Sequence, residues 1–146
     1  MSDSSRYIQP DYSLLNQDHV KRYRETGGEV GHIWNGATAL LLTTIGNKSG
    51  EPRTTPLIYA RSGDDYVVIA SKGGAPAHPA WYLNVSETPE VEIQVMDKVM
   101  KATATTVEGD ERERLWKAAT DVWPNFDQYA ERTDRLIPVV KLTPHA

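Results

Sequence analysis

The 146-residue chain has no cysteine, which excludes disulfide bonds, thiolate metal sites and cysteine nucleophiles. No apolar run approaches the roughly 20 residues that a membrane-spanning helix needs. The nucleophile elbow Gly-x-Ser-x-Gly is missing. The four histidines do not have the spacing of metal ligands. Hydrolase-type covalent catalysis and metal catalysis are therefore not indicated by the sequence.

Positive charge is also scarce, because 20 acidic side chains outnumber 16 Lys and Arg and leave a net charge of −4. This balance argues against general nucleic-acid binding. The composition is otherwise that of a globular protein. We expect a polar, flexible tail at 1–13 and a single domain at 14–146. The polar segment 1–10 lacks the apolar core of a secretory signal, so a cytoplasmic location is expected.

Apolar and β-branched runs alternate with turn residues along most of the chain. These runs predict strands at 37–44, 53–60, 66–70, 89–96, 101–107 and 137–142, and the helical patterns lie at 16–26, 77–85, 110–123 and 126–133. Short links favour antiparallel pairing, with the first three strands forming a meander. The expected fold class is mainly β (α+β), an antiparallel barrel of about six strands with helices packed outside.

The segments 46–50 and 71–74 are glycine-bounded turns that carry a lysine and follow apolar runs. Such turns can point backbone N–H groups outward, and the lysine adds charge, so both can hold a phosphate or another polyanion. A polar hairpin tip is the commoner role of one such turn in isolation. Segment 46–50 is not a P-loop, because it lacks the Gly-Lys-Ser/Thr ending and joins strand to strand.

Arg53 strengthens the anion-site interpretation, because it follows Pro52 and enters a strand beside Lys48. If the strands at 53–60 and 66–70 are neighbours, Lys48, Arg53 and Lys72 meet at one end of the barrel. Three cations in one place repel one another unless an anion neutralises them. The sequence therefore predicts a small anionic ligand at this end.

Two groups of aromatic side chains could complete such a site. Trp81 comes soon after the second turn, and its flat apolar face suits a ring-shaped ligand. Phe126 and Tyr129 share one face of the short helix at 126–133, which could cover a pocket. Core packing is the alternative role for all three side chains.

These residues belong to a longer pattern that runs from about 37 to 144. Its pieces are LLTTIGNKSGEPR at 41–53, TPLIY at 55–59, ASKGG at 70–74, HPAWYLN at 78–84, WP at 123–124, Tyr129, RTDR at 132–135 and IPV at 137–139. In this combination and order, the sequence resembles the deazaflavin-dependent nitroreductase family of actinobacteria.

The resemblance implies a split β-barrel of the flavin-reductase type, with reduced coenzyme F420 as hydride donor. It implies that Lys48, Arg53 and Lys72 hold the phosphate and polyglutamate tail. The other implied cofactor contacts are Thr55, Pro56 and Ala70 beside the ring, with Ser71, Gly73, Gly74 and Trp81 lining the cofactor. Phe126 and Tyr129 would face the acceptor pocket.

The implied reaction is hydride transfer from C5 of F420 to a quinone, nitro compound or other conjugated, electron-poor acceptor. In it the protein holds donor and acceptor face to face and away from water. Ser71 or Tyr129 would hydrogen-bond or protonate the acceptor. Phe126 departs from the tyrosine that is frequent in the family, which puts reduction of bicyclic nitroimidazole prodrugs in question.

Two other functions fit the same residues. An FMN-dependent oxidoreductase on this fold would use the basic turns for the FMN phosphate. A non-catalytic carrier would bind F420 or a lipophile without turnover. The fold type is compatible with a homodimer. The cations of the first helix, Lys21, Arg22 and Arg24, are compatible with a weak contact to the inner face of the membrane.

Overall fold

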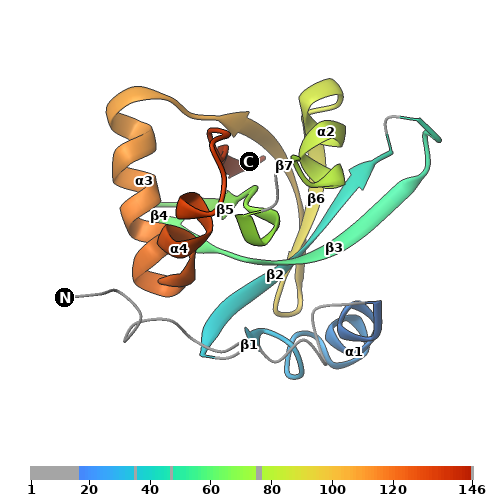
Figure 1. The fold of residues 1–146 in the computed structure, drawn as a ribbon. Coiled ribbons are helices and arrows are strands. Elements are labelled where there is room, and N and C mark those ends of the chain that lie inside the picture. Colours follow the sequence, from blue (N-terminus) through green and yellow to red (C-terminus); the bar gives the residue numbers. More distant parts are fainter. Residues whose placement is uncertain (1–16, 35, 47, 75–76, 146) are drawn as a thin grey trace.

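Residues 17–34, 36–46, 48–74 and 77–145 are described by the structure, a computed structural model. The tail expected at 1–13 lies outside the described residues. Figure 1 shows a curled sheet with helices around its outside. The elements in chain order are α1 (Gln17–Thr26), β1 (Ile33–Trp34), β2 (Ala37–Ile45), β3 (Pro52–Ile58), β4 (Ala60–Ser62), β5 (Asp65–Ile69), η2 (Lys72–Gly74), α2 (Ala80–Glu87), β6 (Glu90–Val95), β7 (Lys98–Thr106), α3 (Gly109–Val122), α4 (Asn125–Glu131) and β8 (Val139–Pro144).

The strands form one antiparallel sheet in the order β1-β2-β6-β7-β8-β5-β4, and β3 pairs with β2 outside this path. β3 and β4 therefore lie at opposite ends of the strand order, although only Tyr59 separates them in the chain. The chain can make this step only if the sheet curls until its two ends meet. This is the α+β split barrel with outer helices that the sequence predicts, and that prediction is confirmed.

The predicted meander is wrong in its third strand. β2 and β3 form the expected hairpin, but β5 pairs with β4 and β8, and β2 pairs with β6 on its other side. The predicted strand at 53–60 is divided at Tyr59 between the two ends of the sheet. The described sheet has eight strands, more than the predicted six, because β1 and β4 are too short to produce a sequence pattern.

Successive side chains of β5 point to opposite faces of the sheet and pack into two different hydrophobic cores. Tyr66 and Val68 point into the barrel interior, where they join a cluster with Trp81 of α2. Val67 and Ile69 point outward into a second cluster, which α3 and α4 cover. The site described below lies next to the first cluster, and α4 belongs to the second.

β2 consists of Ala, Leu, Thr and Ile with no charged side chain, because both of its faces are covered. Leu40 and Leu42 belong to the barrel interior, whereas Leu41 packs against Val20 and Tyr23 of α1. The Tyr23 hydroxyl also donates to the Ala39 carbonyl at 3.0 Å, and burial raises the pKa of Tyr23 to about 12. These contacts hold α1 against the outside of the sheet, as Figure 1 shows.

Two helices follow β7 and cover the outer core. Leu115 and Ala119, four residues apart in α3, are both buried against this core. α3 ends at Val122 with Trp123 as its C-cap, because Pro124 cannot continue the helical hydrogen bonding, and α4 begins directly after this proline. Among the described residues, no helix has the length and apolar character needed to cross a membrane.

Candidate functional site

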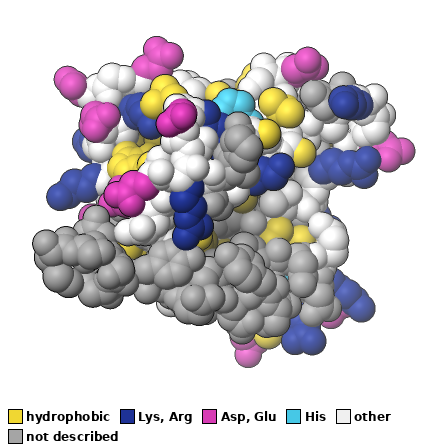
Figure 2. Space-filling view, viewed as in Figure 1, with side chains coloured by type: hydrophobic (Ala, Val, Ile, Leu, Met, Phe, Trp, Pro, Cys, Tyr) yellow, Lys and Arg dark blue, Asp and Glu magenta, His cyan; other side chains and the backbone are white. Residues whose placement is uncertain are grey.

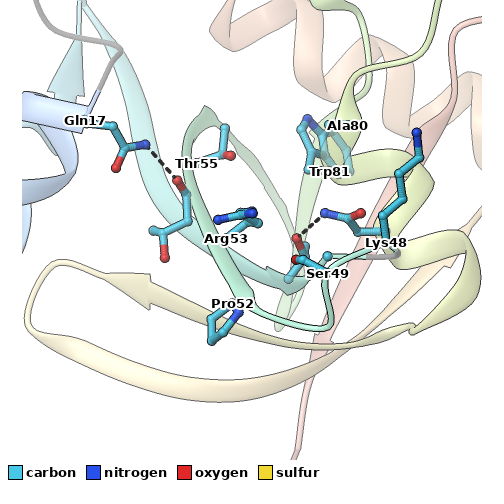
Figure 3. Close-up of a pocket in the computed structure, with 12 residues that line it drawn as sticks. Gln17, Lys48, Ser49, Pro52, Arg53, Thr55, Ala80 and Trp81 are labelled. Atoms are coloured by element: carbon cyan, nitrogen blue, oxygen red, sulfur yellow. Dashed lines mark hydrogen bonds between the residues drawn. The ribbon is translucent and has the colours of Figure 1, made fainter.

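A pocket of about 500 Å³ lies where the β2–β3 hairpin meets α1 and α2 (Figure 3). This volume is within the usual range for small-molecule sites, roughly 300–1,000 Å³. The described residues that line it are Gln17, Thr44, Gly46, Lys48, Ser49, Pro52, Arg53, Thr54, Thr55, Ala80, Trp81 and Asn84. The pocket thus combines two cations with hydroxyl and amide groups and one indole.

The hairpin places its basic side chains through a tight connection between the two strands. The Gly46 N–H donates to the Glu51 carbonyl, and the Gly50 N–H donates to the Gly46 carbonyl, both at 2.8 Å. Gly50 has φ +72°, a left-handed conformation that glycine adopts without strain. Lys48 lies at the exposed tip, and Arg53 pairs with Thr44 near the strand ends. Figure 2 shows basic side chains over this hairpin, at the upper right.

α2 is attached to the hairpin by a buried polar contact. Asn84 Nδ2 donates to Thr44 Oγ1 at 3.0 Å, and Asn84 is 5% exposed. Trp81 lies three residues earlier on the same face of α2 and is also buried. Asn84 therefore holds the indole at the pocket wall. Sequence reasoning missed Asn84 as a site residue, although its spacing from Trp81 was the available signal.

α1 closes another side of the pocket. Gln17 Nε2 donates to the Thr54 carbonyl at 3.3 Å, and Arg24 Nη2 donates to Thr54 Oγ1 at 2.9 Å. Sequence reasoning also missed Gln17 and Thr54. No local pattern could have revealed this contact, because 37 positions separate the two residues.

The structure brings four of the predicted cofactor residues to this one pocket: Lys48, Arg53, Thr55 and Trp81. In Figure 3, Arg53 lies between the α1 side and the α2 side of the pocket. Pro56 follows Thr55 in β3, is buried, and pairs with Leu41. Its predicted place beside a cofactor ring stays a prediction.

The second basic turn forms η2, which packs against α4. Lys72 is exposed and has φ +47°, a left-handed conformation that is unusual for a side-chain-bearing residue. Gly74 lies so close to α4 that an added Cβ would be 2.7 Å from the Tyr129 carbonyl oxygen. Ala70 and Ser71, just before η2, are both buried. Lys72 is not among the described residues that line the pocket, so its convergence with Lys48 and Arg53 stays a prediction.

Phe126 and Tyr129 of α4 are 5% and 7% exposed, and both pack into the outer core. Neither is among the described residues that line the pocket. Their ring centroids are 6.1 Å apart in an edge-to-face arrangement. Trp123 Nε1 donates to the Tyr129 hydroxyl at 3.4 Å. The predicted contact of these two side chains with an acceptor stays a prediction.

A histidine outside the pocket makes the fold sensitive to pH. His32 Nε2 lies 2.8 Å from the Tyr59 hydroxyl. Burial lowers the pKa of His32 below its ordinary value of 6.5 and raises the pKa of Tyr59. The folded state therefore favours the neutral forms of both groups.

We expect the thermal midpoint to fall as the pH drops below about 6.5, because the unfolded chain then binds a proton that folded His32 resists. The loss should stop growing below the lowered pKa of the folded state. His32→Gln keeps a polar group at this position without titrating, so the midpoint of this variant should change less between about pH 7 and pH 5. Scanning fluorimetry of both proteins measures the difference, and equal slopes would contradict the prediction.

The donor set of the pocket suits an anionic, ring-bearing ligand. Lys48 and Arg53 supply positive charge, and Trp81 supplies a flat apolar face. F420 combines a ring with a phosphate and a carboxylate tail, so it fits these residues. Barrel and pocket together define a split-barrel protein with a cationic pocket that suits an anionic cofactor.

The sequence model of the family described as F420H(2)-dependent quinone reductase matches residues 15–144. An F420H(2)-dependent quinone reductase of Mycobacterium tuberculosis is 43% identical over 146 residues, which cover 97% of this chain and 98% of that protein. This chain therefore belongs to the F420H(2)-dependent quinone reductase family. The family consists of oxidoreductases, and F420 is the cofactor that it implies.

The solved structures that are similar to this chain include these two. One is an F420-H2-dependent reductase, FDR-A, with 46% identity and a TM-score of 0.67, covering 71% of this chain and 92% of that chain. The other is described as a domain-swapped dimer, with 39% identity and a TM-score of 0.71, covering 86% of this chain and 92% of that chain.

Proposed function

We propose that this protein transfers a hydride from reduced F420 to a quinone, with the cofactor held in the pocket at the β2–β3 hairpin. The observation that carries the proposal is the meeting of Lys48, Arg53 and Trp81 in one pocket of a chain that belongs to this family. When bound, reduced F420 supplies the hydride, so the protein needs no nucleophile of its own. This agrees with the lack of a hydrolase motif in the sequence.

In this proposal the hairpin binds the anionic part of the cofactor. Lys48 and Arg53 give charge-assisted hydrogen bonds to phosphate or carboxylate oxygens. Lys72 extends the positive charge from η2. Their cationic side chains also attract the cofactor toward a chain whose net charge is −4.

The residues nearer the barrel orient the ring and keep water away. Trp81 forms a rigid apolar wall because its side chain is 6% exposed and belongs to the interior core. Thr55, Pro56 and Ala70 would lie beside the ring, with Gly73 and Gly74 giving backbone contacts. Close, oriented contact between donor and acceptor lowers the barrier, because less freedom is lost at the moment of transfer.

Ser71 and Tyr129 are the proposed partners of the acceptor oxygen. A tryptophan N–H can only donate, so the Tyr129 hydroxyl accepts in its contact with Trp123 and does not use its own proton there. That proton is the one we assign to a hydrogen bond with the acceptor. Phe126 would provide an apolar surface against a flat quinone ring.

We also propose a homodimer and a weak membrane contact. The similar structure described as a domain-swapped dimer supports the first. For the second, Lys21 and Arg22 are exposed on α1, whereas Val20 and Tyr23 are buried against the sheet. Any contact of α1 with an anionic surface would therefore be electrostatic and would weaken at high salt.

The proposed function predicts that the purified protein binds F420 with a dissociation constant in the micromolar range. Titration followed by F420 fluorescence measures binding, with FMN titrated as the matched control ligand. Reduced F420 and menadione should then give turnover. Absence of binding at tens of micromolar F420 would contradict the proposal. Binding without turnover on any of several quinones would indicate a carrier, and preference for FMN would indicate a flavin enzyme.

A further inference from the structure

One arginine outside the pocket makes hydrogen bonds to the turn that precedes α2. Arg135 lies in the loop after α4, and its Nη2 donates to the Ser71 carbonyl at 2.7 Å. Its Nη1 donates to the Ala70 carbonyl at 3.2 Å. The guanidinium therefore binds two successive carbonyls, one at the end of β5 and one at the start of the turn.

The same guanidinium reaches the segment that leads into α2. Arg135 Nη1 lies 3.0 Å from His78 Nδ1, and His78 comes two residues before Ala80, the first residue of α2. One side chain thus connects the end of β5, the η2 turn and the approach to the helix that carries Trp81. α2 borders the pocket through Ala80 and Trp81, and the predicted cofactor contacts Ala70 and Ser71 are the residues whose carbonyls Arg135 binds.

The turn needs support from outside because its own backbone is strained. Lys72 has φ +47°, in the left-handed region that is unfavourable for a residue with a side chain. Such conformations persist only where the surrounding structure holds them. α4 packs against this turn, and Figure 1 shows α4 beside the segment that follows β5.

We propose that Arg135 is a positioning residue that holds the 70–74 turn in its cofactor-binding form, and that protonation of His78 breaks its hydrogen bond to Arg135 and so weakens this support. The inference rests on the proposed function, because it takes the turn as part of the F420 site. Arginine is required for the geometry: its planar fork reaches three acceptors at once, whereas a lysine offers a single point charge.

The charges around His78 explain the pH dependence. In the described residues, the ionisable groups that face its ring are Arg135 and Tyr82 of α2, whose ring centroid is 5.0 Å away. Only a neutral ring accepts a hydrogen bond at Nδ1, and a protonated ring would place a second cation beside the guanidinium. Burial, and secondarily the charge of Arg135, lower the pKa of His78 below 6.5. The hydrogen bond between Arg135 and His78 is therefore fully formed near neutral pH and is lost as the pH falls through this lowered pKa.

The test compares the full-length protein with Arg135→Ala, Arg135→Lys and His78→Asn, and with Arg114→Ala as a control arginine that is exposed on α3. Hydrogen exchange of the 70–78 segment is measured without ligand, together with the F420 dissociation constant, KM and kcat. Arg135→Ala should speed exchange in this segment and raise the dissociation constant and KM about tenfold, with kcat changed less than threefold. Arg135→Lys should recover little, and Arg114→Ala should behave like the natural sequence.

His78→Asn supplies the pH readout, because the amide oxygen can replace Nδ1 as an acceptor and does not titrate. Its F420 affinity should match the natural protein at about pH 7.5 but should lose less on going to about pH 5. The comparison at each pH cancels any ionisation of the ligand. An identical pH profile for the two proteins overturns the role of His78.

The two hypotheses fail in different ways. If the natural protein does not bind F420, the proposed function fails, and the exchange of the 70–78 segment still decides whether Arg135 holds the turn. Unchanged exchange in Arg135→Ala overturns the inference in every case. Faster exchange with an unchanged dissociation constant, in a protein that binds F420, also overturns it.

Discussion

Arg53→Ala is expected to weaken F420 binding by about tenfold to a hundredfold, which corresponds to the loss of a hydrogen bond to a charged group. Arg53 lines the pocket next to Lys48 and pairs with Thr44 of β2, so its backbone is fixed by the hairpin and its side chain is aimed from a rigid strand. Binding of the remote tail is the same in ground and transition states, so kcat at saturating F420 should change little.

Fluorescence titration measures this effect, with Arg61→Ala as the matched control. Arg61 is an exposed arginine of β4 whose guanidinium lies 4.1 Å from the Tyr66 ring centre, and it is not among the described residues of the pocket. Equal affinities for the natural protein and Arg53→Ala would exclude the hairpin as the site of the anionic tail.

A double-mutant cycle of Arg53→Ala and Lys72→Ala decides whether these two cations act on one tail. If Lys72 and Arg53 share this partner, their losses should differ from a simple sum by about 0.5 kcal/mol or more, whereas independent sites add. Lys72→Ala with unchanged affinity would remove Lys72 from the site and leave the role of Arg53 intact.

Gly74→Ala is expected to be among the most destabilising single substitutions in this chain. Gly74 has φ +86°, which costs alanine about 1–2 kcal/mol. The added methyl would also lie 2.7 Å from the Tyr129 carbonyl oxygen and 2.8 Å from Arg132 Cβ, and overpacking of this kind costs about 1–3 kcal/mol more. The combined loss of about 2–5 kcal/mol corresponds to a drop in thermal midpoint of roughly 4–20 °C.

Gly36→Ala separates the two contributions. Gly36 has nearly the same φ, +82°, but nothing lies within 4 Å of an added Cβ. It should therefore show only the conformational cost, about 1–2 kcal/mol. Chemical denaturation of both variants gives the difference. Equal losses would mean that η2 does not pack tightly on α4.

Features whose signals are local could be predicted from the sequence. The run at 37–44 consists only of Ala, Leu and Thr, with no alternation of apolar and charged side chains. A strand covered on both faces requires such a run, as β2 shows. Pro124 marks the end of α3 because proline cannot continue a helix. The resemblance predicted the split barrel, the cofactor and the reductase function from motifs in their order, and these predictions are confirmed.

The pairing of distant segments could not be predicted in the same way. A proline inside a strand is typical of an edge strand or a bulge, so Pro138 within the predicted strand 137–142 favours such a position, yet β8 lies between β7 and β5. The proline is tolerated because it precedes the strand, where its carbonyl accepts from the Ala70 N–H at 3.0 Å. A proline pattern shows which N–H is missing, but not which neighbour the strand has.

The sequence by itself determined the strands and turns, the cationic hairpin and the family, because each is written in neighbouring residues. Only the tertiary structure decided which of these residues meet. It joined Gln17 to Thr54 and Arg135 to Ser71, and it split one predicted strand at Tyr59 between two ends of the sheet. Such contacts depend on how the curled sheet closes, and closure is set by packing across the whole barrel rather than by any short segment.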